Sequence, residues 1–141
     1  MLAQHLATPR IGHLDQVFHV FAYLKKHLRS CIILDATQPF INEESFIPAN
    51  WSDFYRDAHE GIPPNAPEPR GKSVIISCFV DADHAGNQVT RRSHTGIIIF
   101  CNRAPIIWYS KRQNTVETST FGSEFIAARI AVELIEGLRY K

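Results

Sequence analysis

The sequence predicts an α/β protein of the α+β type, in which a three-stranded antiparallel meander is followed by a helix and preceded by an N-terminal amphipathic helix. Two observations carry this prediction. Three short apolar runs follow one another between residues 74 and 109, separated by polar connections, as in a meander of strands. On either side of them, around residues 14–28 and 120–138, apolar residues recur at the spacing of a helix.

The N-terminal helix is predicted over residues 14–28. Polar residues alternate with its apolar positions, and Lys25 and Lys26 lie in its last turns, where the helix dipole favours cations. A short strand is expected to follow at Cys31–Leu34. The apolar positions that define the helix are Leu14, Val17, Phe18, Phe21, Ala22, Leu24 and Leu28.

Residues 36–72 have a different character. Six of the eight prolines fall there, so long helices or strands are not expected across most of the segment. The aromatic residues Trp51, Phe54 and Tyr55 predict a single turn between Ser52 and Asp57. The proline-rich stretch 62–70 is expected to be an extended linker.

The three strands are predicted at residues 74–80, 96–101 and 105–109. The first is an almost continuous apolar run rich in β-branched residues, which favours a strand covered on both faces. The C-terminal helix begins near Thr120, a suitable N-cap, and Arg129 with Glu133 forms an i,i+4 ion pair on its polar side. Its apolar stripe is Phe121, Phe125, Ala128, Ala131, Val132, Ile135 and Leu138.

Composition excludes several classes of protein. The 141 residues carry a formal net charge of +1, so no bulk positive field indicates a nucleic-acid partner. The three cysteines are odd in number and lie in apolar runs, which favours reduced thiols over a disulfide framework. Apolar runs of about seven residues are too short to cross a membrane, and the N-terminus has no signal-peptide pattern. We expect an intracellular protein, in a cytoplasmic particle or the nucleus, that is not secreted.

Two carboxylates are candidates for chemistry. Asp81 ends the first strand, where an acidic residue commonly just begins a turn. Glu124 lies one turn into the last helix on its apolar side, where a carboxylate is costly unless it is paired or binds a metal, although it also interacts well with the helix dipole. If that helix packs across the strands, Glu124 approaches Asp81, and two converging carboxylates suit Mg²⁺.

A series of motifs between residues 80 and 125 closely resembles the ribonuclease H signature of copia-type LTR retrotransposon polyproteins. The motifs are Val80-Asp81-Ala82-Asp83, Ala85-Gly86, Arg91-Arg92-Ser93 with Gly96, Trp108 with Ser110-Lys111 and Gln113, then Val116, Ser119 and Glu124. The N-terminal stretch resembles the end of the reverse transcriptase of the same polyprotein, through Ala7-Thr8-Pro9-Arg10, His13 and Tyr23-Leu24-Lys25.

The resemblance implies three regions. Residues 1–35 correspond to the tail of the reverse transcriptase, 36–72 to a proline-rich insertion or linker, and 73–141 to the N-terminal half of a ribonuclease H-like domain. Its implied fold is a mixed sheet flanked by helices. Family members commonly have Trp, Asp and Thr where this chain has His84, Asn87 and His94.

The resemblance also implies a chemistry. Asp81 and Glu124 match two catalytic, metal-binding carboxylates of the family. The reaction would be hydrolysis of the RNA strand of an RNA–DNA hybrid with two Mg²⁺ ions. The implied partners are the hybrid and the remainder of the polyprotein, with no membrane. Expected nucleic-acid contacts are Arg91, Arg92, Ser93, Lys111, Arg112 and Gln113, although a solvated turn explains Lys111 and Arg112 equally well.

The family needs two further carboxylates, on a fourth strand and a last helix. The chain ends at Lys141, after the helix that carries Glu124, so we expect it to be inactive by itself. Two other readings stay open: a domesticated or relic module that binds nucleic acid or serves a structural role without catalysis, and an integrase-like nuclease of the same superfamily. The integrase would lack the Arg91-Arg92-Ser93 motif and the motif around Trp108.

The first strand also predicts a behaviour in solution. Its apolar character suits the middle of a sheet, yet only the second strand is available to pair with it. An apolar strand with a free edge is a template for another chain. We therefore expect poor solubility, edge-to-edge self-association, or cover of that edge by Cys31–Leu34.

Overall fold

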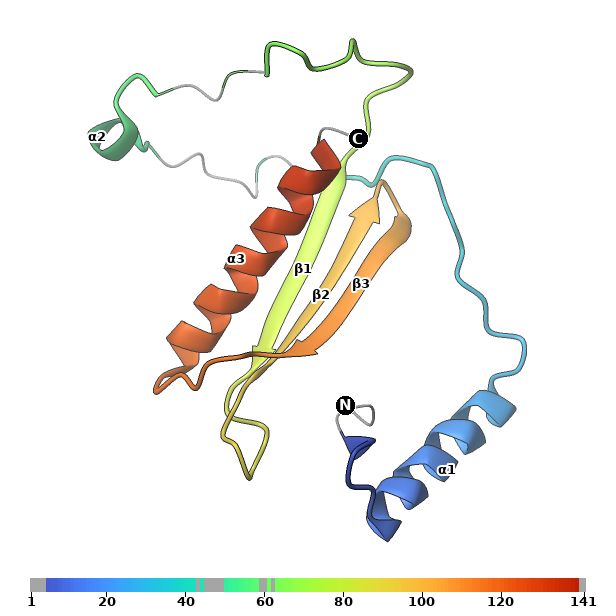
Figure 1. The fold of residues 1–141 in the computed structure, drawn as a ribbon. Coiled ribbons are helices and arrows are strands. Elements are labelled where there is room, and N and C mark those ends of the chain that lie inside the picture. Colours follow the sequence, from blue (N-terminus) through green and yellow to red (C-terminus); the bar gives the residue numbers. More distant parts are fainter. Residues whose placement is uncertain (1–4, 43, 45–49, 59–60, 62, 140–141) are drawn as a thin grey trace.

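The computed structural model describes residues 5–42, 44, 50–58, 61 and 63–139. Along the described chain, two helices precede a three-stranded sheet and a long helix follows it (Figure 1). The elements are α1 (Ile11–Lys26), α2 (Ser52–Tyr55), β1 (Ile76–Asp83), β2 (His94–Cys101), β3 (Ala104–Arg112) and α3 (Thr120–Arg139). The predicted α+β class and the order of its elements are confirmed.

The sheet is the predicted antiparallel meander, with the order β1-β2-β3. β1 pairs with β2 from Ile76 opposite Cys101 to Asp83 opposite His94, without a register shift. β2 pairs with β3 along its length, with one irregularity at Ile99/Phe100. β1 is therefore an edge strand of the described sheet, and its outer edge is unpaired there.

The two faces of the sheet differ. Successive side chains of a strand point to opposite faces, and α3 covers the face that carries Cys78, Ile97 and Ile99. The other face, which we call the open face, carries the alternate residues of each strand. Its apolar members are Phe79, Ile98, Phe100, Pro105 and Trp108.

The expectation that the first strand is covered on both faces is wrong for the described chain. Phe79, on the open face of β1, is 63% exposed. The reason is that α3 covers one face only, and no described helix or strand lies on the other. The continuous apolar run therefore predicts packing on both faces of β1, but the described residues cover only one of them.

The buried face of α3 is rotated about the helix axis relative to the predicted apolar stripe. The side chains buried against the sheet are Ser123, Ala127 and Ala131, flanked by Ile130 and Leu134. Most of the expected stripe is exposed instead: Phe121, Phe125, Ala128 and Val132. Small residues at i, i+4 and i+8 let the helix approach the sheet closely, which two phenylalanines would prevent. Three members of the expected stripe do reach the core as predicted: Ala131, which is buried, and Ile135 and Leu138 at the border.

The ends and surface of α3 agree more closely with the expectation. Ser119 Oγ accepts a hydrogen bond from the Gly122 N–H at 3.2 Å, so the cap lies one residue before the predicted Thr120. The expected ion pair forms on the exposed side, with 2.9 Å between Arg129 Nη1 and Glu133 Oε1.

The N-terminal half folds locally but packs little. α1 is confirmed as a helix, yet none of its residues is buried and it contacts no other described helix or strand. The single turn predicted between Ser52 and Asp57 is also confirmed, as α2. Cys31–Leu34 is not a strand: Ile32 and Leu34 lie beside Pro105, Ile106 and Trp108 of β3, so they do not cover the β1 edge. Within the described residues no helix is both long and apolar enough to cross a membrane.

Candidate functional site

Asp81 lies near the C-terminal end of β1, opposite Gly96 of β2. Its neighbour Ala82 is buried on the α3 side, so the Asp81 side chain points to the open face, where it is exposed. Asp83 lies two residues further along the same strand and shares that face. The absence of a side chain at Gly96 leaves the Asp81 carboxylate without a cross-strand neighbour that would crowd it.

Glu124 lies in the second turn of α3 and is half-buried, next to the fully buried Ser123. α3 packs mainly against β1 and begins at the end of the sheet where β1 ends (Figure 1). Asp81 and Glu124 are therefore at the same end of the molecule. Asp81 points to the open face, whereas Glu124 lies on the flank of the helix that covers the other face. That their carboxylates converge stays a prediction.

The chemistry of these two groups suits Mg²⁺, which prefers oxygen ligands. However, the described residues contain no group of three or more His, Cys, Asp or Glu side chains arranged to hold a metal ion. Binding of Mg²⁺ by Asp81 and Glu124 therefore stays a prediction.

The loop between β1 and β2 is held in one shape by its own side chains. Ser93, which is fully buried, accepts a hydrogen bond from the Ala85 N–H through its Oγ at 3.0 Å. Asn87 Oδ1 accepts from the N–H groups of Val89 and Thr90. Gly86 passes so close to the Asp83 carboxylate that a Cβ would collide with it. The glycine and the serine of the sequence motifs therefore have structural roles here.

The same loop is joined to α3. His84 Nδ1 lies 3.3 Å from Ser123 Oγ, and the Ser123 hydroxyl donates to the Thr120 carbonyl oxygen at 2.7 Å. Because the hydroxyl hydrogen is used in that bond, His84 Nδ1 is the donor toward Ser123. This bond links the loop after Asp81 to the turn of α3 that carries Glu124.

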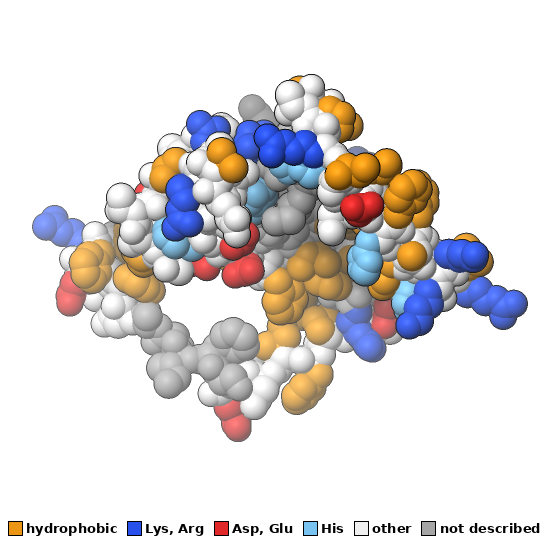
Figure 2. Space-filling view, turned by 90° about the horizontal axis from the view of Figure 1, so that it is seen from below, with side chains coloured by type: hydrophobic (Ala, Val, Ile, Leu, Met, Phe, Trp, Pro, Cys, Tyr) orange, Lys and Arg blue, Asp and Glu red, His pale blue; other side chains and the backbone are white. Residues whose placement is uncertain are grey.

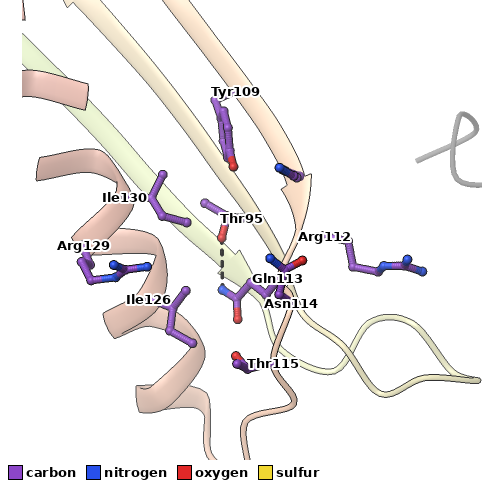
Figure 3. A pocket seen from close by; sticks show the side chains of 10 residues that line it. Thr95, Tyr109, Arg112, Gln113, Asn114, Thr115, Ile126, Arg129 and Ile130 are labelled. Atoms are coloured by element: carbon purple, nitrogen blue, oxygen red, sulfur yellow. Dashed lines mark hydrogen bonds between the residues drawn. The ribbon is translucent and has the colours of Figure 1, made fainter. Parts of the chain in front are cut away.

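Gln113 makes a second link between the sheet and α3. It is 4% exposed, and its Nε2 donates to Thr95 Oγ1 at 3.1 Å (Figure 3). The same Nε2 donates to the Ser123 carbonyl oxygen at 2.9 Å. Its backbone N–H donates to the Ser93 carbonyl oxygen at 2.8 Å. Gln113 and Ser93, both expected to contact nucleic acid, are thus interior residues that fix the end of the sheet against α3.

The remaining expected contact residues are nearer the surface. Arg91 and Lys111 are exposed, and Arg92 and Arg112 are half-buried. Lys111 and Arg112 line a cavity of about 230 Å³ between the end of β3 and α3, together with Arg129 (Figure 3). Viewed from this end of the molecule, positive and negative side chains lie close to one another rather than as one basic surface (Figure 2).

Asn102, which no sequence motif indicated, lies in the β2–β3 hairpin with a φ of 54°. Its Oδ1 accepts from the Ile75 N–H at 2.9 Å and its Nδ2 donates to the Ala36 carbonyl oxygen at 2.8 Å. It therefore joins the hairpin, the start of β1 and the N-terminal segment. An asparagine in a hairpin turn predicts positive φ, but nothing local indicates its distant partners.

Two known proteins are similar in sequence to parts of this chain. Over 58 residues the chain is 40% identical to the Retrovirus-related Pol polyprotein from transposon TNT 1-94 of Nicotiana tabacum, a match that covers 41% of this chain and 4% of that protein. Over 66 residues it is 39% identical to an uncharacterized mitochondrial protein of Arabidopsis thaliana, covering 46% of this chain and 28% of that protein.

No protein-family model and no solved structure matches this chain. The two relatives confirm the resemblance to a copia-type retrotransposon polyprotein. The chain is therefore homologous to part of a retroelement polyprotein, and its matches span small parts of longer proteins.

Proposed function

We propose that this chain carries the first part of a retroelement ribonuclease H-like domain, with Asp81 and Glu124 as two of its metal-binding carboxylates. In the complete domain, the reaction is hydrolysis of the RNA strand of RNA–DNA hybrids during reverse transcription. Two bound Mg²⁺ ions would supply the activation of water and the stabilisation of the leaving oxygen. Glu124 and Asp81 contribute negative charge to that site.

One observation carries this proposal. The motif residues lie in order along the elements β1, β2, β3 and α3 and the loops between them. Asp81 is near the end of β1, and Glu124 is near the start of α3, the helix that packs on β1. The links from His84 to Ser123 and from Gln113 to Ser123 hold the carboxylate-bearing elements together at this end of the sheet. Such positioning residues are what a metal site on two different elements requires.

We expect the 141-residue chain alone not to cleave an RNA–DNA hybrid, because two carboxylates are too few to hold two Mg²⁺ ions about 4 Å apart. The measurement is cleavage of a labelled hybrid at millimolar Mg²⁺, with Asp81→Asn as the control. Metal-dependent cleavage that Asp81→Asn abolishes would show that the chain is itself sufficient.

In a longer polyprotein containing the segments downstream of α3, Asp81→Asn and Glu124→Gln should each reduce cleavage to background while the circular dichroism spectrum stays unchanged. Glu133→Gln, on the exposed side of the same helix, is the matched control and should retain activity. Near-normal activity in either site variant would remove that residue from the site.

A second function has some support, namely a relic or domesticated module that binds nucleic acid without cleaving it. The lack of a three-ligand group among the described residues favours it. Hybrid binding by the chain alone, weakened by Lys111→Glu and by Arg112→Glu but unaffected by Asp81→Asn, would support this function. Fluorescence anisotropy at two salt concentrations measures it, since phosphate contacts weaken as salt rises.

A further inference from the structure

The open face of the sheet is apolar and lacks cover in the described part of the chain. Phe79 on β1 and Trp108 on β3 are 63% and 66% exposed, and Ile98 lies between them on β2. Phe79 also meets Phe100 edge to face, with ring centroids 5.8 Å apart. A contiguous apolar surface across three strands indicates that another element packs there.

α1 lacks a partner in the same way. Its apolar stripe, formed by Leu14, Phe18, Phe21 and Leu24, is exposed, and no described helix or strand packs against it. A helix of 16 residues is marginally stable in water unless tertiary packing covers its apolar face. The helix and the open face therefore each expose the kind of surface that the other needs.

The connection between them already lies on the open face. Ile32 and Leu34 border a cavity that Pro105, Ile106 and Trp108 also line. Immediately after them, Asp35 pairs with Arg103 at 3.3 Å, and the Ala36 carbonyl oxygen accepts from Asn102 Nδ2 at 2.8 Å. We call these two contacts the hairpin clamp, because they attach the N-terminal segment to the β2–β3 hairpin.

We propose that α1 of the same chain docks on the open face, over Phe79, Ile98 and Trp108, and forms a third layer opposite α3. This interface would continue the contact that Ile32 and Leu34 already make with β3. The dimensions agree: a 16-residue helix is about 24 Å long, and an eight-residue strand is about 26 Å long. Residues 27–34 connect α1 to the hairpin clamp and can span about 26 Å when extended, which is enough to let the helix fold back onto the sheet.

The hairpin clamp sets the direction of the docked helix. The C-terminus of α1 leads to the clamp, so with that end toward the β2–β3 hairpin, α1 presents its N-terminus to the end of the sheet that carries Asp81 and Asp83. No acidic residue lies in the first turn of α1, and Arg10 is its N-cap. The positive end of the helix dipole is compatible with the two carboxylates there, which are interspersed with basic side chains such as Arg112.

The first test follows the exposure of Trp108. Trp51→Phe leaves Trp108 as the single tryptophan, whose acrylamide quenching and emission wavelength report whether α1 covers it. In this background, Phe18→Asp with Phe21→Asp should raise the quenching constant and shift the emission to longer wavelength. The matched control, Gln16→Asp with His19→Asp on the opposite side of α1, should leave both unchanged. Equal quenching in all three proteins would overturn the proposal.

The second test substitutes a residue of the sheet and measures amide hydrogen exchange in α1. Amide hydrogen exchange should show protection across Leu14–Leu24, and Phe79→Asp should remove that protection while the amides of α3 stay protected. This readout does not depend on altering α1 itself. Docking would be contradicted if the α1 amides of the parent chain were unprotected. It would also be contradicted if they were protected to the same degree in Phe79→Asp.

Concentration distinguishes the two possible sources of the helix. Docking of the chain's own α1 gives Trp108 quenching that does not change on dilution, even where chains associate through the edge of β1. Quenching that rises as the protein is diluted would assign the helix to a second copy and overturn the intramolecular arrangement.

Discussion

α1 and α3 are both amphipathic by sequence, but only α3 packs against the sheet. α3 buries Ser123, Ala127 and Ala131 against the sheet, whereas α1 buries no residue. The apolar side chains of α1 are large, and those that α3 buries are small. Helical periodicity thus predicts that a segment is a helix, but the size of its side chains determines which face can approach a sheet closely.

The two halves of the chain differ in the same sense. Residues 76–139 contain all the members of the apolar core, centred on Ile97, Ile99 and Ala131. The described N-terminal residues form helices through local hydrogen bonds and reach the rest mainly through the hairpin clamp. Stability should therefore be concentrated in the C-terminal unit, and local opening should begin in the N-terminal half.

The largest effect is expected at the centre of the core. Ile99→Ala should lower the free energy of unfolding by about 2–5 kcal/mol, because it removes buried methylene groups and leaves a cavity. Ile99 is fully buried, whereas Val89, the matched control for Val89→Ala, is 92% exposed and should show no change. Urea denaturation followed by circular dichroism measures both. Equal effects of the two substitutions would remove the contrast between core and surface.

The close approach of α3 can be tested within one helix. Ala127→Leu should cost about 1–3 kcal/mol, because there is no room for added volume where the helix meets the sheet. Ala128→Leu, one residue away on the exposed side, should have an effect near zero. Thermal unfolding of the two variants gives the comparison. A more destabilising Ala128→Leu would mean that the predicted stripe, and not the small-residue stripe, faces the sheet.

The interior role of Gln113 predicts a similar but smaller loss. Gln113→Ala should lower stability by about 1–3 kcal/mol, because it leaves buried partners at Thr95 and Ser123 without their hydrogen bonds. Lys111→Ala, at an exposed position of β3, should leave stability unchanged. Denaturant midpoints measure both. Loss of hybrid binding by Gln113→Ala at full stability would restore its role as a nucleic-acid contact.

The free edge of β1 predicts an effect of concentration rather than of mutation. Nothing in the described chain pairs with that edge, so the protein should be poorly soluble or self-associate through it. Sedimentation velocity across a dilution series should show association, with slower amide exchange of β1 at high concentration. A single monomeric species with rapid exchange along one side of β1 would contradict the expectation.

The smallest effect concerns the hairpin clamp. Hydrogen bonds from the Thr37 side chain and backbone N–H are the main cause that lowers the pKa of Asp35, and Arg103 adds to it. A lowered pKa in the folded state means that the contribution to stability is present above the ordinary pKa and is lost as the pH falls through the lowered one. The Asp35 carboxyl resonance should therefore titrate below its usual range, and Thr37→Ala should raise that pKa. An unchanged titration would exclude Thr37 as the cause.

The sequence alone determined the two long helices, the three strands of the sheet and their order, because periodicity is a local property of the chain. The short strand that it predicted at Cys31–Leu34 is not formed. The sequence also singled out Asp81 and Glu124 through motifs. Their convergence remains a prediction, although the structure brings β1 and α3 together at one end of the sheet.

The tertiary structure decided what depends on distant partners. It determined which face of α3 is buried, and it placed Ile32 and Leu34 beside β3 rather than along the edge of β1. It also showed that the side chains of Ser93, Gln113 and Asn102 make hydrogen bonds between separate segments. Packing distance and hydrogen bonds between remote residues depend on the whole fold, as in the bond from Asn102 to Ala36. No local pattern contains them, because each is satisfied only when separate elements meet.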